Sequence, residues 1–171
     1  MSRFPSAANS GATPIPVRSW YGLRGEIAVE NELWHLVKVA GVSLNHPPVV
    51  NWIMRRGPPP EDRLRLSFFH EYGHLQTFPL ALAHLAWLLF MGRWRGLGAK
   101  GLLARLAAAA VAHEAVWELA SETYAILGAG PEYRRAYRAH PNPLRPLFWA
   151  VMVTLAILGS ILTLRPRDDA S

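Results

Sequence analysis

The hydrophobic positions of this chain fall into two contrasting patterns. Between residues 15 and 54, short runs rich in β-branched and aromatic side chains alternate with Gly, Asn and Pro, a pattern that predicts a few strands in a small sheet. Three longer apolar runs follow at 75–91, 102–127 and 147–164, and their length predicts helices. The expected fold class is therefore α+β and mainly α, with a small β-rich N-terminal part.

Changes in composition divide the chain into three regions. Residues 1–14 are small and polar and are expected to form a disordered leader. Residues 15–60 form the β-rich region and end in a proline-rich hinge at 55–60, because consecutive prolines fix φ and remove backbone donors. Residues 61–171 are expected to form a helical, membrane-associated domain whose acidic first residues suit the start of a helix.

The apolar runs also indicate a membrane protein. The run at 147–164 has 18 residues without a charge, close to the roughly 20 that a helix needs to cross a bilayer. The other two runs carry polar groups, including three glutamates in 102–127. We expect three long apolar helices, mostly inserted in the membrane, in a multi-pass integral protein. The alternative is that some of them are core helices of a soluble protein.

Charge and cysteine content narrow the partners and the chemistry. The formal net charge is +6 and there is no cysteine, so any bound metal must be held by histidine, carboxylate or water. The basic residues flank the apolar runs and do not form one patch interleaved with aromatics, which favours the lipid bilayer over nucleic acid as a partner. The basic segment Arg134–Arg145 is expected to be a loop that contacts anionic lipid or covers the site.

The segment His70-Glu71-Tyr72-Gly73-His74 carries the clearest chemistry. Two histidines four residues apart lie one helical turn apart on one face, so both imidazoles can reach one ion. Zinc lowers the pKa of its bound water to about 7, and Glu71 is placed to take the proton of that water and pass it to a leaving amine. The motif predicts one Zn²⁺ per chain, held by His70 and His74, with Glu71 as the catalytic base. Residue 80 is Leu, which excludes the extended pattern with a third histidine.

A second patch, Glu118-Leu-Ala-Ser-Glu122 within ELASETYA, completes a recognisable pair. HEYGH followed by ELASETYA resembles the gluzincin metallopeptidases, and the apolar helices between them are similar to the membrane-embedded branch that includes the CAAX-prenyl proteases. The resemblance covers residues 68–78 and 114–126. It implies a peptidase acting on peptides or proteins, with Glu118 as the third zinc ligand. Glu122, which stands where the family usually has Asp, would accept a hydrogen bond from a ligand imidazole and fix its tautomer.

The distances along the chain support the pairing of these two patches independently. If two antiparallel helices meet at a turn near Gly96, residues equally far from that turn lie at the same level. His74 and Glu118 each lie 22 residues from Gly96, and His70 and Glu122 each lie 26 residues from it. Each histidine is therefore expected to face a glutamate.

Three further residues are candidates to stabilise the oxyanion of a peptidase reaction: His113, Tyr124 and His140. Residues Val49–Ile53, which precede the HEYGH helix, are the candidate edge strand for binding a substrate backbone. An ordinary core strand is the alternative there.

Two other functional classes remain open. Glu71-Tyr-Gly-His74 is also an ExxH sequence, and with Glu114, Glu118 and Glu122 it could form a carboxylate-bridged di-iron site. Such sites usually need a second ExxH, but Ser121 stands at that histidine position. The other class is a membrane protein without catalysis, in which His and Glu form a polar network or hold a structural metal.

A count of the flanking charges predicts the orientation in the membrane. An excess of basic residues marks the cytoplasmic side of a membrane protein. The active-site side has more of them than the opposite side, so we expect the active site on the cytoplasmic side. The active-site side carries eight and the opposite side six: Arg55, Arg56, Arg63, Arg65, Arg134, Arg135, Arg138 and Arg145 against Arg93, Arg95, Lys100, Arg105, Arg165 and Arg167.

Overall fold

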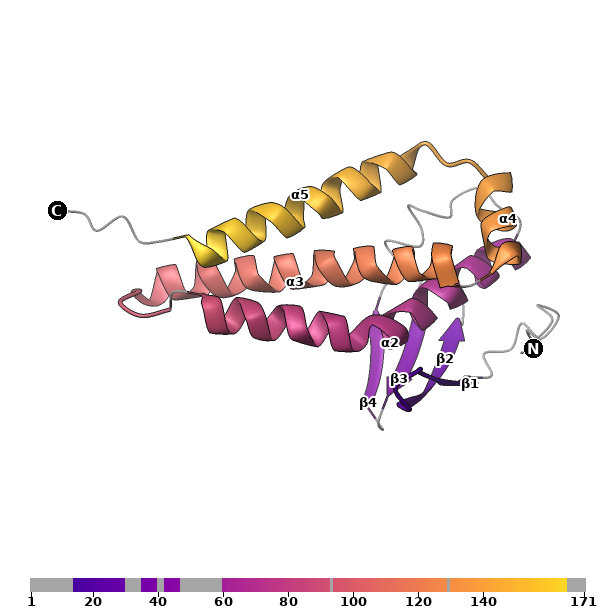
Figure 1. The fold of residues 1–171 in the computed structure, drawn as a ribbon, viewed down its shortest axis with the longest axis horizontal. Helices are drawn as coiled ribbons and strands as arrows, with labels where there is room; N and C mark the ends of the chain where they lie inside the picture. The colour runs from indigo at the N-terminus through magenta and orange to yellow at the C-terminus, as the bar shows by residue number, and fades with distance from the viewer. Residues whose placement is uncertain are drawn as a thin grey trace. The chain divides into compact units, whose positions relative to one another are not determined.

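The computed structural model of this chain describes residues 14–29, 35–39, 42–46, 60–92, 94–128 and 130–165 (Figure 1). Backbone packing divides the chain into two compact units. Unit 1 contains residues 1–76 and 121–148, and unit 2 contains residues 77–120 and 149–171. The two longest helices run without interruption from one unit into the other.

The strands lie in unit 1 and form one antiparallel sheet in which each strand pairs with the next in the chain. They are β1 (Ile15–Arg18), β2 (Arg24–Val29), β3 (His35–Val39) and β4 (Val42–His46). Ile15 pairs with Ile27 across β1 and β2, and Ile27 is fully buried. The expected small β-rich part is therefore confirmed. Residues 1–13, the hinge residues 55–59 and the candidate substrate strand Val49–Ile53 lie outside the described residues.

Four helices follow the sheet among the described residues (Figure 1). They are α2 (Pro60–Met91), α3 (Ala99–Gly128), α4 (Pro131–Ala139) and α5 (Leu144–Leu164). The three long helices α2, α3 and α5 contain the three apolar runs, as expected. The expectation of a basic loop after α3 was wrong, because residues 131–139 form α4. Pro131 begins this helix, where its fixed φ suits the first turn.

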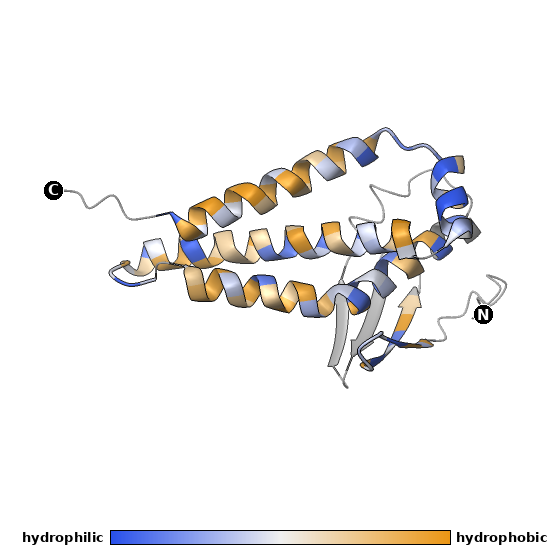
Figure 2. Cartoon of the chain, in the orientation of Figure 1, coloured by the Kyte–Doolittle hydropathy of each residue, from blue (hydrophilic) through white to orange (hydrophobic). Residues whose placement is uncertain are grey.

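Among the residues that the structure describes, two helices are apolar and long enough to cross a membrane, one fewer than expected. The two segments are Arg65–Met91 of α2 and Leu144–Leu164 of α5, and only 22% and 17% of their most apolar windows are buried. Figure 2 shows α5 mostly in the hydrophobic colours. In α3, three glutamates and two basic residues interrupt an alanine-rich sequence, and each such charge opposes insertion in a bilayer.

The turn between β1 and β2 compensates for a proline inside α2. Pro79 lies within this continuous helix, and because proline has no N–H, the carbonyl of Leu75 loses its usual partner four residues on. The hydroxyl of Tyr21 donates to that carbonyl oxygen at 2.6 Å. The indole N–H of Trp20 donates to the next carbonyl, that of Gln76, at 3.0 Å. The turn therefore fastens the sheet to α2 directly after the HEYGH segment.

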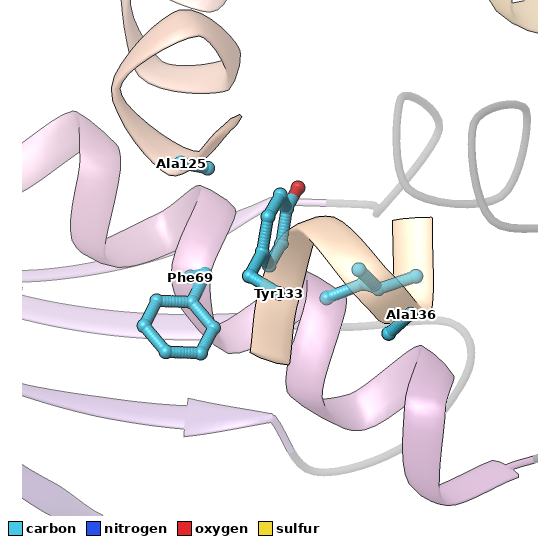
Figure 3. Packing of buried hydrophobic residues seen from close by; sticks show 5 residues of the cluster. Phe69, Ala125, Tyr133 and Ala136 are labelled. Carbon is cyan, nitrogen blue, oxygen red and sulfur yellow. The ribbon is translucent and has the colours of Figure 1, made fainter. Parts of the chain in front are cut away.

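Each unit has its own packed core. In unit 1, Phe69 of α2, Ala125 of α3, and Tyr133 and Ala136 of α4 are buried together (Figure 3). In unit 2, Leu88 of α2 packs on the small residues Ala109 and Ala112 of α3. Gly159 of α5 approaches α3 so closely that an added Cβ would lie 2.9 Å from the Cβ of Ala112. Within unit 2, α3 thus contacts both of the helices that could cross a membrane.

Candidate metal centre

The residues expected to hold a metal come together between α2 and α3. One ligand atom from each of His70, His74 and Glu118 lies within 4.8 Å of the other two. His70 and Glu118 are buried and His74 is half-buried. Among the residues that the structure describes, this is the one group of three such side chains that could hold a metal ion.

The positions of the two imidazoles fit a shared ion. The Nε2 atoms of His70 and His74 lie 3.2 Å apart. Two nitrogens bound to one tetrahedral zinc at about 2.0–2.1 Å would lie about 3.4 Å apart. Two imidazoles and one carboxylate form a ligand set that zinc accepts, and they leave the fourth position open for water or substrate.

Glu122 orients His70 from α3. Its Oε2 atom lies 2.8 Å from Nδ1 of His70, and both side chains are almost completely buried. Because a neutral imidazole has one N–H, donation from Nδ1 to the carboxylate leaves the lone pair of Nε2 available to bind a metal ion. The hydroxyl of Tyr133 donates to the other oxygen, Oε1, at 3.3 Å. Glu122 thus reaches the imidazole, and a tyrosine of α4 also holds this carboxylate.

Ser121 performs the corresponding task for His74. Its Oγ atom lies 2.8 Å from Nδ1 of His74, and a hydroxyl can accept the Nδ1–H just as a carboxylate does. With this arrangement both Nε2 atoms are available to the ion. Sequence reasoning missed Ser121 because it looked for a carboxylate. The only available signal was its position next to Glu122 on the helix facing HEYGH.

Gly73 allows α2 and α3 to approach each other at this site. A Cβ added to Gly73 would collide with the backbone carbonyl oxygen of Ser121. Any other residue at position 73 would therefore push apart the backbones that carry the histidines and their partners. The sequence holds a weak signal, since a glycine inside a helix is destabilising and usually has a packing reason.

Glu71, the expected catalytic base, is fully buried on α2. It follows the ligand His70 directly in a continuous helix. In a motif of this kind, the glutamate after the first histidine borders the metal ion without binding it. Its catalytic role stays a prediction.

The three oxyanion candidates have different surroundings. The ring of Tyr124 lies 6.2 Å from that of Tyr72, beside the HEYGH segment. His113 stacks on His84 at 6.3 Å and lies five residues before Glu118, about 7.5 Å along α3. His140 binds Asp62, with Nε2 2.7 Å from Oδ2. None of the three belongs to the group of metal-binding atoms found in the described part of the chain.

Glu114 bears on the choice between one and two metal ions. Its side chain is exposed, and it does not belong to the group formed by the two histidines and Glu118. A di-iron site needs additional carboxylates that bridge the two ions. The described geometry therefore favours a single ion.

No protein-family model, no curated protein and no solved structure matches this chain. We therefore infer its function from the geometry of the site and from the two patches that resemble gluzincins.

Proposed function

We propose that this protein is a membrane-embedded zinc metallopeptidase that hydrolyses peptide bonds. The observation that carries the proposal is the convergence of three ligand atoms, from His70, His74 and Glu118. Ser121 and Glu122 hold the opposite nitrogens of the two imidazoles. Two histidines whose tautomers are fixed in this way, together with a carboxylate and an open fourth position, are typical of catalytic zinc sites.

The chain supplies the proton transfers of the reaction. Bound zinc would polarise the scissile carbonyl and lower the pKa of the attacking water. Glu71 would take a proton from the attacking water as the water oxygen bonds to the carbonyl carbon. It would then give the proton to the amide nitrogen as the C–N bond breaks. Tyr124 and His113 stay the candidates for stabilising the oxyanion.

The lengths of the apolar helices support a site near the membrane surface. The segment Arg65–Met91 has 27 residues and is about 40 Å long, whereas the hydrocarbon core is about 30 Å thick. His70 and His74 lie in its first ten residues, near one end of the crossing. The contact of Asp62 with His140 supports placing the starts of α2 and α5 on one side. We propose that α3 returns through the same layer, with Ala109 packed on α2 and Ala112 against α5 within unit 2.

The substitution Glu71→Gln tests catalysis separately from metal binding. Purified in detergent, the variant should keep its zinc but hydrolyse a quenched-fluorescence peptide library at least about 100-fold more slowly, because the general base is lost. The exposed carboxylate of Glu114 offers a matched control, and Glu114→Gln should cleave at the native rate. Equal activity of the native chain and Glu71→Gln would refute the proposal. A native chain that binds zinc and cleaves nothing would favour the non-catalytic alternative.

A further inference from the structure

The helix α4 has a strongly basic outer face. Arg134, Arg135 and Arg138 are exposed, whereas Tyr133 and Ala136 on the opposite face are buried in unit 1. Figure 2 shows α4 mostly in the hydrophilic colours. Among the residues that the structure describes, no carboxylate forms an ion pair with these three guanidinium groups. The outer face of α4 therefore carries three exposed guanidinium groups.

The chain places this face at a membrane surface if α5 crosses the bilayer. Only four residues separate the end of α4 at Ala139 from the start of α5 at Leu144, so the two lie at most about 18 Å apart. The start of α2 contacts the segment between α4 and α5, because Nε2 of His140 lies 2.7 Å from Oδ2 of Asp62. The polar layers that flank the hydrocarbon core, about 5–8 Å thick on each side, are thus within reach of α4.

The inner face of α4 is linked to the metal centre. Tyr133 donates to Oε1 of Glu122, whose Oε2 holds Nδ1 of the ligand His70. The ring of Tyr133 is fixed by an edge-to-face contact with Phe69 at 5.4 Å (Figure 3). At the other end of α4, the guanidinium of Arg145 lies 3.8 Å from the centre of the Tyr137 ring. A displacement of α4 would therefore move the tyrosine that holds Glu122.

We propose that the outer face of α4 binds the anionic headgroups of membrane phospholipids, and that this contact holds Tyr133 on Glu122 and keeps the metal in its site. This inference rests on the proposed membrane-embedded zinc site. Three arginines within five residues complement anionic lipid. Nucleic acid fits this face less well, because Tyr133 is buried and the half-buried ring of Tyr137 is covered by Arg145, which leaves little aromatic surface for stacking bases. Tyr133 is a positioning residue in this proposal.

Two measurements on the full-length protein in lipid nanodiscs test the proposal. The first measures by native mass spectrometry how strongly the protein retains phosphatidylglycerol over phosphatidylcholine. The second follows the release of zinc to a chelator in discs with and without phosphatidylglycerol. Arg134→Gln with Arg138→Gln removes two charges from the face. Arg18→Gln with Arg24→Gln, two exposed basic residues paired across β1 and β2, removes the same charge as a matched control.

We expect the native chain to prefer phosphatidylglycerol and to release zinc severalfold more slowly in its presence. The Arg134/Arg138 variant should lose about fivefold in lipid preference for each arginine and lose the lipid effect on zinc release, whereas the control keeps both. Tyr133→Phe should keep the lipid preference while its zinc release no longer depends on lipid. If Tyr133 has a purely structural role, Tyr133→Phe should instead release zinc faster by the same factor in discs with and without phosphatidylglycerol.

Each other result points to a different error. A variant without Arg134 and Arg138 that retains phosphatidylglycerol as the native chain does would overturn the lipid surface. If the native chain prefers phosphatidylglycerol but releases zinc at the same rate with and without it, the coupling through Tyr133 would be refuted. If inorganic phosphate in discs without phosphatidylglycerol slows zinc release as much as phosphatidylglycerol does, the bound anion need not be a lipid headgroup, and the membrane contact would be refuted. Absence of zinc from every sample would overturn the proposed function, yet the lipid preference would still test the surface.

Discussion

The Nδ1 atom of His70 lies 2.8 Å from the Oε2 atom of Glu122, and the two side chains are only 2% and 0% exposed. The two residues are 52 positions apart in the sequence and belong to different helices. A buried imidazole that donates to a carboxylate has one fixed tautomer, and its other nitrogen becomes a better metal ligand. The contact therefore prepares His70 for an ion that the remaining ligands can share.

Removing the groups that hold the imidazoles should weaken metal binding without removing a ligand. Glu122→Gln keeps a hydrogen-bond acceptor but loses the charge, and Ser121→Ala removes the partner of His74. We expect each to lower zinc affinity about 10-fold to 100-fold, measured by competition with a fluorescent chelator. Glu114→Gln on the same helix should have native affinity. Native zinc affinity in Glu122→Gln would show that the contact with His70 does not serve the metal.

Gly73→Ala should separate α2 from α3 at the metal centre. The added Cβ collides with the carbonyl oxygen of Ser121, and overpacking of this kind costs about 1–3 kcal/mol. Thermal unfolding in detergent should show the loss, together with weaker zinc binding. Gly98→Ala is the matched control, because a Cβ there would meet no atom within 4 Å. Equal stability of the two variants would contradict the close approach at Gly73.

Tyr21→Phe should destabilise the fold because Pro79 makes Leu75 depend on the tyrosine hydroxyl. A buried carbonyl that loses its donor costs about 1–3 kcal/mol. In the Pro79→Ala background, the N–H of residue 79 can bond the same carbonyl, so Tyr21→Phe should cost much less there. A double-mutant cycle of unfolding free energies measures this coupling. Additive effects of the two substitutions would mean that Tyr21 does not replace the missing helical bond.

The same tyrosine predicts a loss of stability at alkaline pH. Burial raises the pKa of Tyr21 above its usual value of 10.0, although a hydrogen bond with Ser19 partly opposes this. The folded protein thus holds this proton more tightly than the unfolded chain. The resulting stability is complete below about pH 10 and is lost as the pH rises through the folded-state pKa. Unfolding free energies at about pH 8, 10 and 11 should fall less steeply for Tyr21→Phe than for the native chain. An identical slope would assign the alkaline loss to other groups.

The sequence was sufficient to predict the long helices and the partner of one ligand. The apolar runs located α2, α3 and α5, because helices of this length are determined by local composition. Equal distances from Gly96 predicted that His70 faces Glu122, which follows from two regular helices of the same rise joined by a short turn. The number of helices apolar enough to cross a membrane was overestimated, because the prediction gave the length of the α3 run more weight than its charges.

The features that were missed depend on contacts between distant segments. Tyr21 and Leu75 are 54 residues apart, and no local pattern indicates that a turn of the sheet would satisfy a carbonyl freed by Pro79. The prediction of a loop over Arg134–Arg145 was wrong for its first part because it considered the arginines without Tyr133 and Ala136, which are buried. The contact of Tyr133 with Glu122 became visible only once α4 was placed in unit 1.

The most direct test of the central claim is the metal content of the detergent-purified protein, measured by mass spectrometry. The native chain should contain one zinc, whereas His74→Ala and Glu118→Ala should lose it, because each removes one of three ligands. Glu114→Gln should keep its zinc. Two irons per native chain would instead establish the di-iron alternative. A native chain without metal, or zinc that persists after loss of both His74 and Glu118, would contradict the metal centre.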